Sequence, residues 1–90
     1  MSVAIENPNG VKSVYANNTF VSATSWDIRL TFSELIPDPL DGPVTNELRA
    51  NVVLTPKQAK ALAMTLSGVV QKYEEQLGEI VWPDQLNSNR

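Results

Sequence analysis

The chain has 90 residues, of which 42% are hydrophobic and 19% are charged, and its formal net charge at pH 7 is -3. This length and composition predict one folded domain and exclude a disordered or low-complexity chain. The seven Lys and Arg residues are scattered and form no basic patch, so we expect no nucleic-acid partner.

The sequence contains no Cys and no His. Their absence removes thiol nucleophiles, disulfides, the usual structural zinc sites and histidine acid–base chemistry. The motifs of a nucleophile elbow, a phosphate-binding loop and a dinucleotide-binding turn are missing as well. We therefore expect a protein that is not an enzyme, with no catalytic residues, no cofactor and no metal site.

The N-terminal residues are polar and are interrupted by Pro8 and Gly10, which is unlike a secretion signal. No apolar segment approaches the ~18 residues that a membrane span needs. We expect a cytoplasmic protein with no membrane partner. Residues 1–13 are predicted to be a flexible arm.

The first predicted strand, at about 18–24, is rich in β-branched and aromatic residues. Its start has two interpretations. Either a single strand covers about 18–24, or Asn17 and Asn18 are turn residues and a short extra strand lies at about 11–16.

Two further strands are predicted at about 26–34 and 47–54, with a loop of three prolines and one glycine at 36–46 between them. Apolar and polar residues alternate in both, which is typical of an antiparallel sheet that is covered on one face. In the second strand the apolar face holds Trp26, Ile28, Leu30 and Phe32. In the third strand it holds Leu48, Ala50, Val52 and Leu54.

A long helix is predicted over residues 56–77. Thr55 and Gln58 form a capping box, and Gly78 suits the residue that follows a helix. A continuous apolar stripe follows at spacings of three and four. The predicted fold class is therefore α+β, a three-stranded antiparallel meander followed by one helix packed on its apolar face. We assign residues 14–83 to this single domain and residues 84–90 to a flexible tail. The stripe holds Ala59, Leu62, Ala63, Leu66, Val69, Val70, Tyr73 and Leu77.

The charges of the helix oppose its dipole, with lysines in the first turns and glutamates in the last. A second line of residues on the side away from the stripe suggests a reason. If two copies pack antiparallel about a two-fold axis near position 66, Lys57 lies opposite Glu75 of the partner subunit. Met64 then lies opposite Gly68 of the partner subunit. The alternative is that the charges are solvated and that Gly68 accommodates the sheet beneath the helix. The predicted interface holds Lys57, Ala61, Met64, Gly68, Lys72 and Glu75.

Two groups of acidic residues are candidates for a metal site or for acid–base catalysis. Asp38 and Asp41 lie close to Glu47, but they lack the ligand alternation of a calcium loop. Glu74 and Glu75 are adjacent on a helix and point about 100° apart, so they do not converge on one proton. We expect both groups to be solvated.

Three short motifs stand out in order: Tyr15-Ala16-Asn17, Asp27-Ile28-x-Leu30-x-Phe32 and Tyr73-Glu74-x-x-x-Gly78-x-Ile80. Over residues 14–83 they resemble a family of small bacterial proteins catalogued as a domain of unknown function. Ser33 stands where that family has a glycine. The resemblance implies a compact, cytoplasmic, bacterial domain, and it implies no catalytic residue, cofactor or substrate.

These features favour a non-enzymatic interaction or assembly domain. We expect it to form a homodimer, and another protein is a candidate second partner. The small size of the usable core supports this expectation, because small domains are marginally stable alone. The alternative is a small-ligand-binding or enzymatic domain with a pocket between sheet and helix, near Tyr15, Trp26 and Tyr73.

Overall fold

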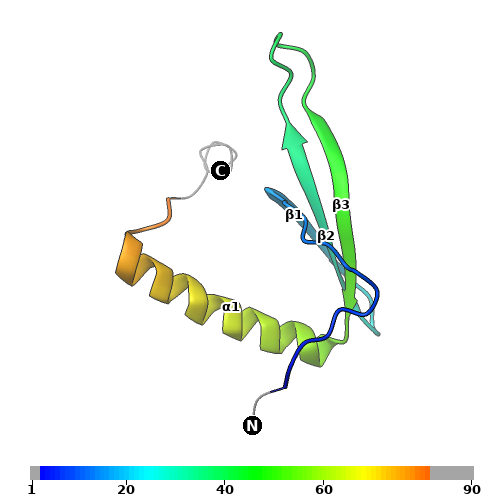
Figure 1. Cartoon of the computed structure of the whole chain (residues 1–90), viewed down its shortest axis with the longest axis vertical. Helices are drawn as coiled ribbons and strands as arrows, with labels where there is room; N and C mark the ends of the chain where they lie inside the picture. The colour runs from blue at the N-terminus through cyan, green and yellow to red at the C-terminus, as the bar shows by residue number, and fades with distance from the viewer. Residues whose placement is uncertain (1–2, 82–90) are drawn as a thin grey trace. The chain divides into compact units, whose positions relative to one another are not determined.

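The protein consists of a three-stranded sheet followed by one long helix (Figure 1). The structure is a computed structural model that describes residues 3–81, so the predicted tail at 84–90 lies outside the described residues. The predicted α+β class, with a meander and a helix, is confirmed. The elements are β1 (Asn18–Ala23), β2 (Ile28–Ile36), β3 (Thr45–Leu54) and α1 (Pro56–Leu77).

The chain divides into two units, Met1–Leu54 with the sheet and Thr55–Arg90 with the helix. Each unit is described by itself. The packing of the helix on the apolar face of the sheet, and the single domain over residues 14–83, stay predictions.

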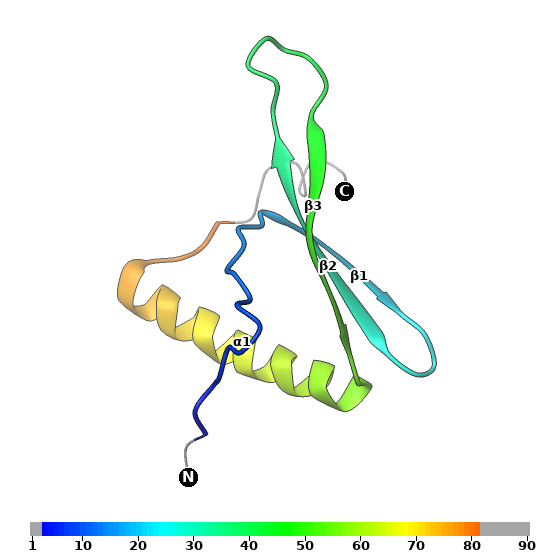
Figure 2. The ribbon, with the colours of Figure 1, turned by 45° about the vertical axis from the view of Figure 1, so that its right-hand side comes forward.

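The sheet has the order β1-β2-β3, and both pairs of neighbours are antiparallel (Figure 2). Leu30 pairs with Val21 on one side and with Val52 on the other, so the three side chains lie on the same face. The predicted alternation over residues 28–32 is confirmed. We name the two sides the Leu30 face and the Thr31 face. The Leu30 face holds Val21, Ala23, Ile28, Leu30, Phe32, Ala50, Val52 and Leu54.

A β-bulge shifts the register between β2 and β3. Phe32 pairs with Ala50, but the next residue, Ser33, pairs with Leu48, so Arg49 is the extra residue. The shift moves Leu48 to the Thr31 face, and its predicted place beside Ala50 is wrong. The Thr31 face is therefore less polar than the alternation indicated. It carries four large apolar residues, Phe20, Leu35, Leu48 and Val53.

Two details at the ends of β1 differ from the predictions. Trp26 is not part of a strand, because it lies in the turn between β1 and β2 and is 85% exposed. The strand at 11–16 is absent, and β1 begins at Asn18. Asn17 precedes β1, and its backbone N–H donates to the carbonyl of Ser33, one residue out of register with the Asn18–Ser33 pair.

Helix α1 begins and ends at the predicted residues. The Thr55 hydroxyl accepts a hydrogen bond from the Gln58 backbone N–H at 3.1 Å, and Pro56 occupies the first turn. Gly78 follows the last turn with φ of 103°, a conformation that favours glycine. The first turn has no acidic residue and the last turn has no basic one, so the charges do oppose the dipole.

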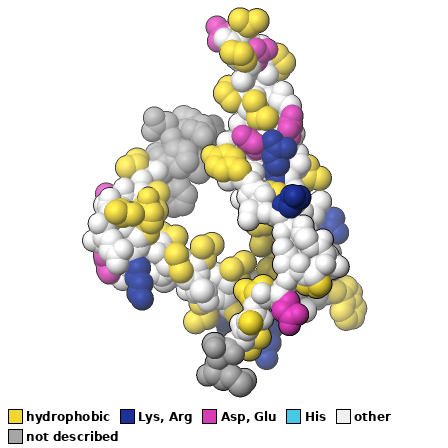
Figure 3. All heavy atoms as spheres, viewed as in Figure 1, with side chains coloured by type: hydrophobic (Ala, Val, Ile, Leu, Met, Phe, Trp, Pro, Cys, Tyr) yellow, Lys and Arg dark blue, Asp and Glu magenta, His cyan; other side chains and the backbone are white. Residues whose placement is uncertain are grey.

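Neither unit, taken by itself, buries an apolar side chain among residues 3–81. Ser33 is the one buried residue of this described part, at 3% exposure. Hydrophobic side chains lie at the surface along both the sheet and α1 (Figure 3). A lone three-stranded sheet and a lone helix are marginal in water. Both units therefore need a cover for their apolar faces.

Candidate interaction surface

The predicted interface residues lie on one side of α1, and all are exposed. Met64 is the largest apolar residue among them and is 69% exposed. Within the helix unit, a side chain added at Gly68 would meet nothing within 4 Å. A mid-helix glycine costs about 1 kcal/mol relative to alanine. The open space is therefore available to a second molecule. The five residues of the prediction are Lys57, Ala61, Met64, Gly68 and Glu75, with Lys72 on the same line.

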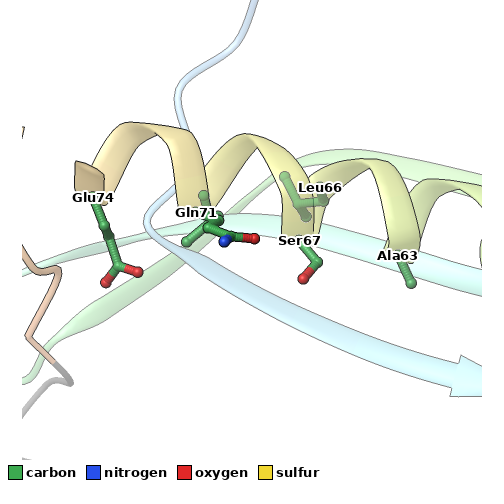
Figure 4. A pocket seen from close by; sticks show the side chains of 6 residues that line it. Ala63, Leu66, Ser67, Gln71 and Glu74 are labelled. Atoms are coloured by element: carbon green, nitrogen blue, oxygen red, sulfur yellow. The ribbon is translucent and has the colours of Figure 1, made fainter. Parts of the chain in front are cut away.

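The opposite side of α1 carries the apolar stripe, which is also exposed. Leu66 is 54% exposed, Val69 58% and Leu77 70%. An open hollow follows part of this stripe, and Ser67, Gln71 and Glu74 supply its polar edge (Figure 4). Its described lining comes from a single helix face, which does not enclose a small molecule on several sides. The described lining is Ala63, Leu66, Ser67, Val70, Gln71 and Glu74.

The ligand pocket of the alternative interpretation involves residues from both units. Tyr15 and Trp26 belong to the sheet unit and are 66% and 85% exposed, and Tyr73 belongs to the helix and is 51% exposed. None of the three is a described lining residue of the hollow on α1. A pocket between sheet and helix stays a prediction.

The motif Tyr73-Glu74-x-x-x-Gly78-x-Ile80 forms the C-terminal end of α1. The Gly78 N–H donates to the Glu74 carbonyl at 3.0 Å, and the Ile80 N–H donates to the Glu74 carboxylate at 2.9 Å. Glu74 therefore holds the chain as it leaves the helix. This role accounts for one of the two glutamates that oppose the dipole. The structure describes no such contact for Glu75, which is exposed.

The motif Tyr15-Ala16-Asn17 leads into the first strand. The side chain of its asparagine bonds to β2 in the way that a backbone group of a neighbouring strand would. The Asn17 side-chain oxygen accepts from the Leu35 N–H at 2.8 Å, and its amide donates to the Leu35 carbonyl at 3.3 Å. The side chain thus satisfies both backbone groups of Leu35 on β2. The neighbouring Asn18 amide donates to the Ser33 hydroxyl at 3.2 Å. Ser33 is therefore buried with a partner.

Asp27, in the second motif, closes the turn between β1 and β2. The Thr24 hydroxyl donates to the Asp27 carboxylate at 3.0 Å and accepts from the Asp27 backbone N–H at 3.2 Å. The Thr24 backbone N–H donates to the Asp27 carbonyl at 2.9 Å. The polar groups of Asp27 are therefore engaged within the turn, which is a structural role.

A charged cluster lies at the β-bulge on the Leu30 face. Arg49 donates to the Glu34 carboxylate at 2.7 Å and to the Glu47 carboxylate at 3.0 Å. The hydrogen bond with Glu34 raises the pKa of the Arg49 guanidinium above its ordinary value, and the negative charges of both glutamates add to this. The bulge is what brings Arg49 onto the side of its two partners. Since both glutamates are satisfied by Arg49, the cluster holds the hairpin together.

The loop between β2 and β3 is folded by its own residues. The Asp38 carboxylate accepts from the Leu40 N–H at 2.8 Å, and the Asp41 N–H donates to the Asp38 carbonyl at 3.1 Å. A side chain added at Gly42 would clash with the Asp38 side chain, so the glycine permits this turn. Within residues 3–81, no group of three or more acidic side chains is close enough to hold a metal ion.

Across the described residues no helix has the length and apolar character of a membrane span. The elements define an α+β protein, a meander followed by a helix, whose motifs maintain turns and caps. The family model described as "Protein of unknown function (DUF3467)" matches residues 2–81, and the chain belongs to this family. The predicted family resemblance is confirmed. No curated protein and no solved structure matches the chain.

Proposed function

We propose that the chain is a non-enzymatic interaction or assembly domain that works as a homodimer. The observation that carries the proposal is that no apolar side chain is buried in either unit over residues 3–81. Monomeric proteins rarely leave contiguous apolar patches of more than a few hundred Å² exposed. The cytoplasmic location and bacterial origin expected from the sequence are part of the same proposal.

The dimer contact that we propose is the line of residues on α1. Two antiparallel copies about an axis near position 66 place Lys57 beside Glu75 of the partner subunit. They also place Met64 in the open space at Gly68 of the partner subunit, which the structure leaves unfilled. Each exposed charge pair contributes only about 0.2–1 kcal/mol. The charges therefore set the register, and the burial of Met64 and Ala61 supplies affinity. Lys60 and Lys72 approach each other across the axis and weaken this contact somewhat.

The absence of Cys, His and any nucleophile motif supports the non-enzymatic part of the proposal. Among the described polar residues, Asp27 and Glu74 are already engaged by backbone groups and a neighbouring hydroxyl. These contacts are typical of structural groups, because a catalytic group needs to reach a substrate. A turnover that is lost in Asp27→Asn or Glu74→Gln protein would contradict this part.

The experiment is sedimentation of the purified chain and of Gly68→Leu over a range of concentrations. We expect a dimer for the natural sequence and a shift toward monomer for Gly68→Leu, since the new side chain fills the space meant for Met64. Gln76→Leu adds the same side chain away from the line and should leave the dimer intact. A natural chain that is monomeric at all concentrations overturns the homodimer, and a Gly68→Leu dimer of unchanged affinity overturns this contact.

A further inference from the structure

The two edges of the sheet differ in how they are protected. Natural sheets guard their edges with charges, prolines or bulges, because an open edge pairs with other chains. The outer strand β3 has two of these protections. It has a bulge at Arg49, and it has charged residues at Glu47 and Arg49. The outer strand β1 reads Asn-Thr-Phe-Val-Ser-Ala, and it has no charge, no proline and no bulge between Asn18 and Ala23.

The open edge of β1 is exposed and has a high strand propensity. Phe20 is 55% exposed and Val21 64%. Among the described residues, no strand other than β2 pairs with β1. An uncharged strand of β-branched and aromatic residues at a free edge is the type of surface that accepts another strand.

The phase of the ladder shows which backbone groups of β1 point outward. The Thr24 N–H donates to the Asp27 carbonyl, so this pair is a hydrogen-bonded one. Pairs alternate along an antiparallel ladder, so the even-numbered residues of β1 direct their N–H and C=O groups to β2. The outward groups therefore belong to Thr19, Val21 and Ala23.

We propose that β1 pairs antiparallel with β1 of a second copy of this chain, about a two-fold axis at Val21. This register places Val21 opposite itself and Thr19 opposite Ala23 of the partner subunit, so all three outward pairs bond and provide about six backbone hydrogen bonds. No like charges meet, because the strand has none. Val21 lies on the Leu30 face, so the pairing joins the Leu30 faces of both copies on one side of a six-stranded sheet.

This inference rests on the proposed homodimer and adds a second contact to it. A six-stranded sheet also enlarges the apolar surface that one dimer can cover, which favours stability for a chain of this size.

The first test is sedimentation of Val21→Pro beside Val21→Thr. Proline removes the Val21 N–H, which points away from β2, so the ladder within the chain keeps its hydrogen bonds while the pairing between copies loses its central ones. We expect the dimer dissociation constant of Val21→Pro to rise at least about ten-fold, which corresponds to 1.4 kcal/mol or more. Val21→Thr keeps the N–H and the branched shape, and its dimer should persist. Circular dichroism checks that both variants keep the natural fold.

The second test uses the absence of natural cysteines. In Val21→Cys the two new thiols face each other across the axis, with Cα atoms about 5.5 Å apart, which is within the range of a disulfide. Mild oxidation should give a covalent dimer with Val21→Cys and none with Thr45→Cys, which lies at the start of β3.

The outcomes separate the two contacts. If the natural chain is a dimer, but Val21→Pro dimerises as tightly and Val21→Cys does not crosslink, the strand pairing is wrong and the α1 contact stands. If Val21→Pro is monomeric while Gly68→Leu is an unchanged dimer, the strand pairing is supported and the α1 contact is wrong. A monomeric natural chain overturns both.

Discussion

The sheet and the helix use their polar side chains in different ways. In the sheet unit, Asn17, Thr24 and Arg49 all bond to other groups of the same unit. On α1 the described side-chain hydrogen bonds lie only at the two ends, through Thr55 and Glu74. Between these ends the helix has several charged residues and no described partner within the chain. The sheet is thus fixed in shape by its own contacts, whereas the middle of α1 has polar and apolar groups that a partner can use.

The largest expected effect tests whether the Leu30 face is the covered one. Phe32 lies on that face, so Phe32→Ala should lower the free energy of unfolding by about 3–5 kcal/mol, because a large apolar side chain is lost from a covered surface. Phe20→Ala makes the same change on the Thr31 face, where the ring is 55% exposed, and should cost about 1 kcal/mol or less. Urea melts of both variants measure the difference. A loss below about 1 kcal/mol for Phe32→Ala would mean that this face is not covered.

An intermediate effect tests how far the sheet depends on its polar contacts. Asn17→Ala removes both hydrogen bonds to the backbone of Leu35 and should cost about 1–3 kcal/mol. Asn46 pairs with Leu35 from the β3 side, and its side chain makes no described hydrogen bond. Asn46→Ala is therefore the matched control and should change the stability by less than about 0.5 kcal/mol. Equal losses in thermal or urea melts would show that Asn17 has no special role.

The smallest expected effect tests the charged residues in the first and last turns of α1. In the proposed dimer, Lys57→Glu or Glu75→Lys alone brings like charges together and should weaken dimerisation by about 0.2–1 kcal/mol per pair. The double variant restores the pair with opposite polarity and should recover the affinity. Sedimentation at low ionic strength gives the largest signal, because salt screens exposed charges. A double variant as weak as the sum of the two single ones would exclude this pairing.

The elements could be predicted from the sequence, and several of the contacts could not. The alternation of apolar and polar residues predicts β2, and the capping residues predict both ends of α1. Both signals depend only on neighbouring residues, so they can be read from the sequence. The bulge at Arg49 has no local signature, since Leu48 continues the alternation without a break. The contact that accompanies it, between Arg49 and Glu34, joins residues fifteen positions apart in the chain. The bonds from Asn17 to Leu35 span eighteen residues and were missed for the same reason.

Two residues of the motifs also show where local reasoning is insufficient. Trp26 fitted the alternation, but the Thr24 hydroxyl accepts from its backbone N–H and holds it in a turn. Glu74 looked like a charge that opposes the helix dipole, and its contact with Ile80 depends on the path of the chain beyond Gly78. The contact between Glu74 and Ile80, six residues apart, can be recognised in the spacing of the motif only after the geometry is known.

The strand order of the sheet has a consequence for how the chain is made. Each strand pairs with the next one in sequence, so the pairings close only short loops and carry a small entropic cost. Hairpins form in about 1–10 μs, whereas a ribosome adds about 5–20 residues per second. The meander can therefore form as soon as Leu54 has left the ribosome, before the helix that follows it has emerged. Until the helix emerges, the nascent sheet presents its Leu30 face and its uncharged β1 edge to the surrounding solution, and neighbouring nascent chains on one messenger can meet there.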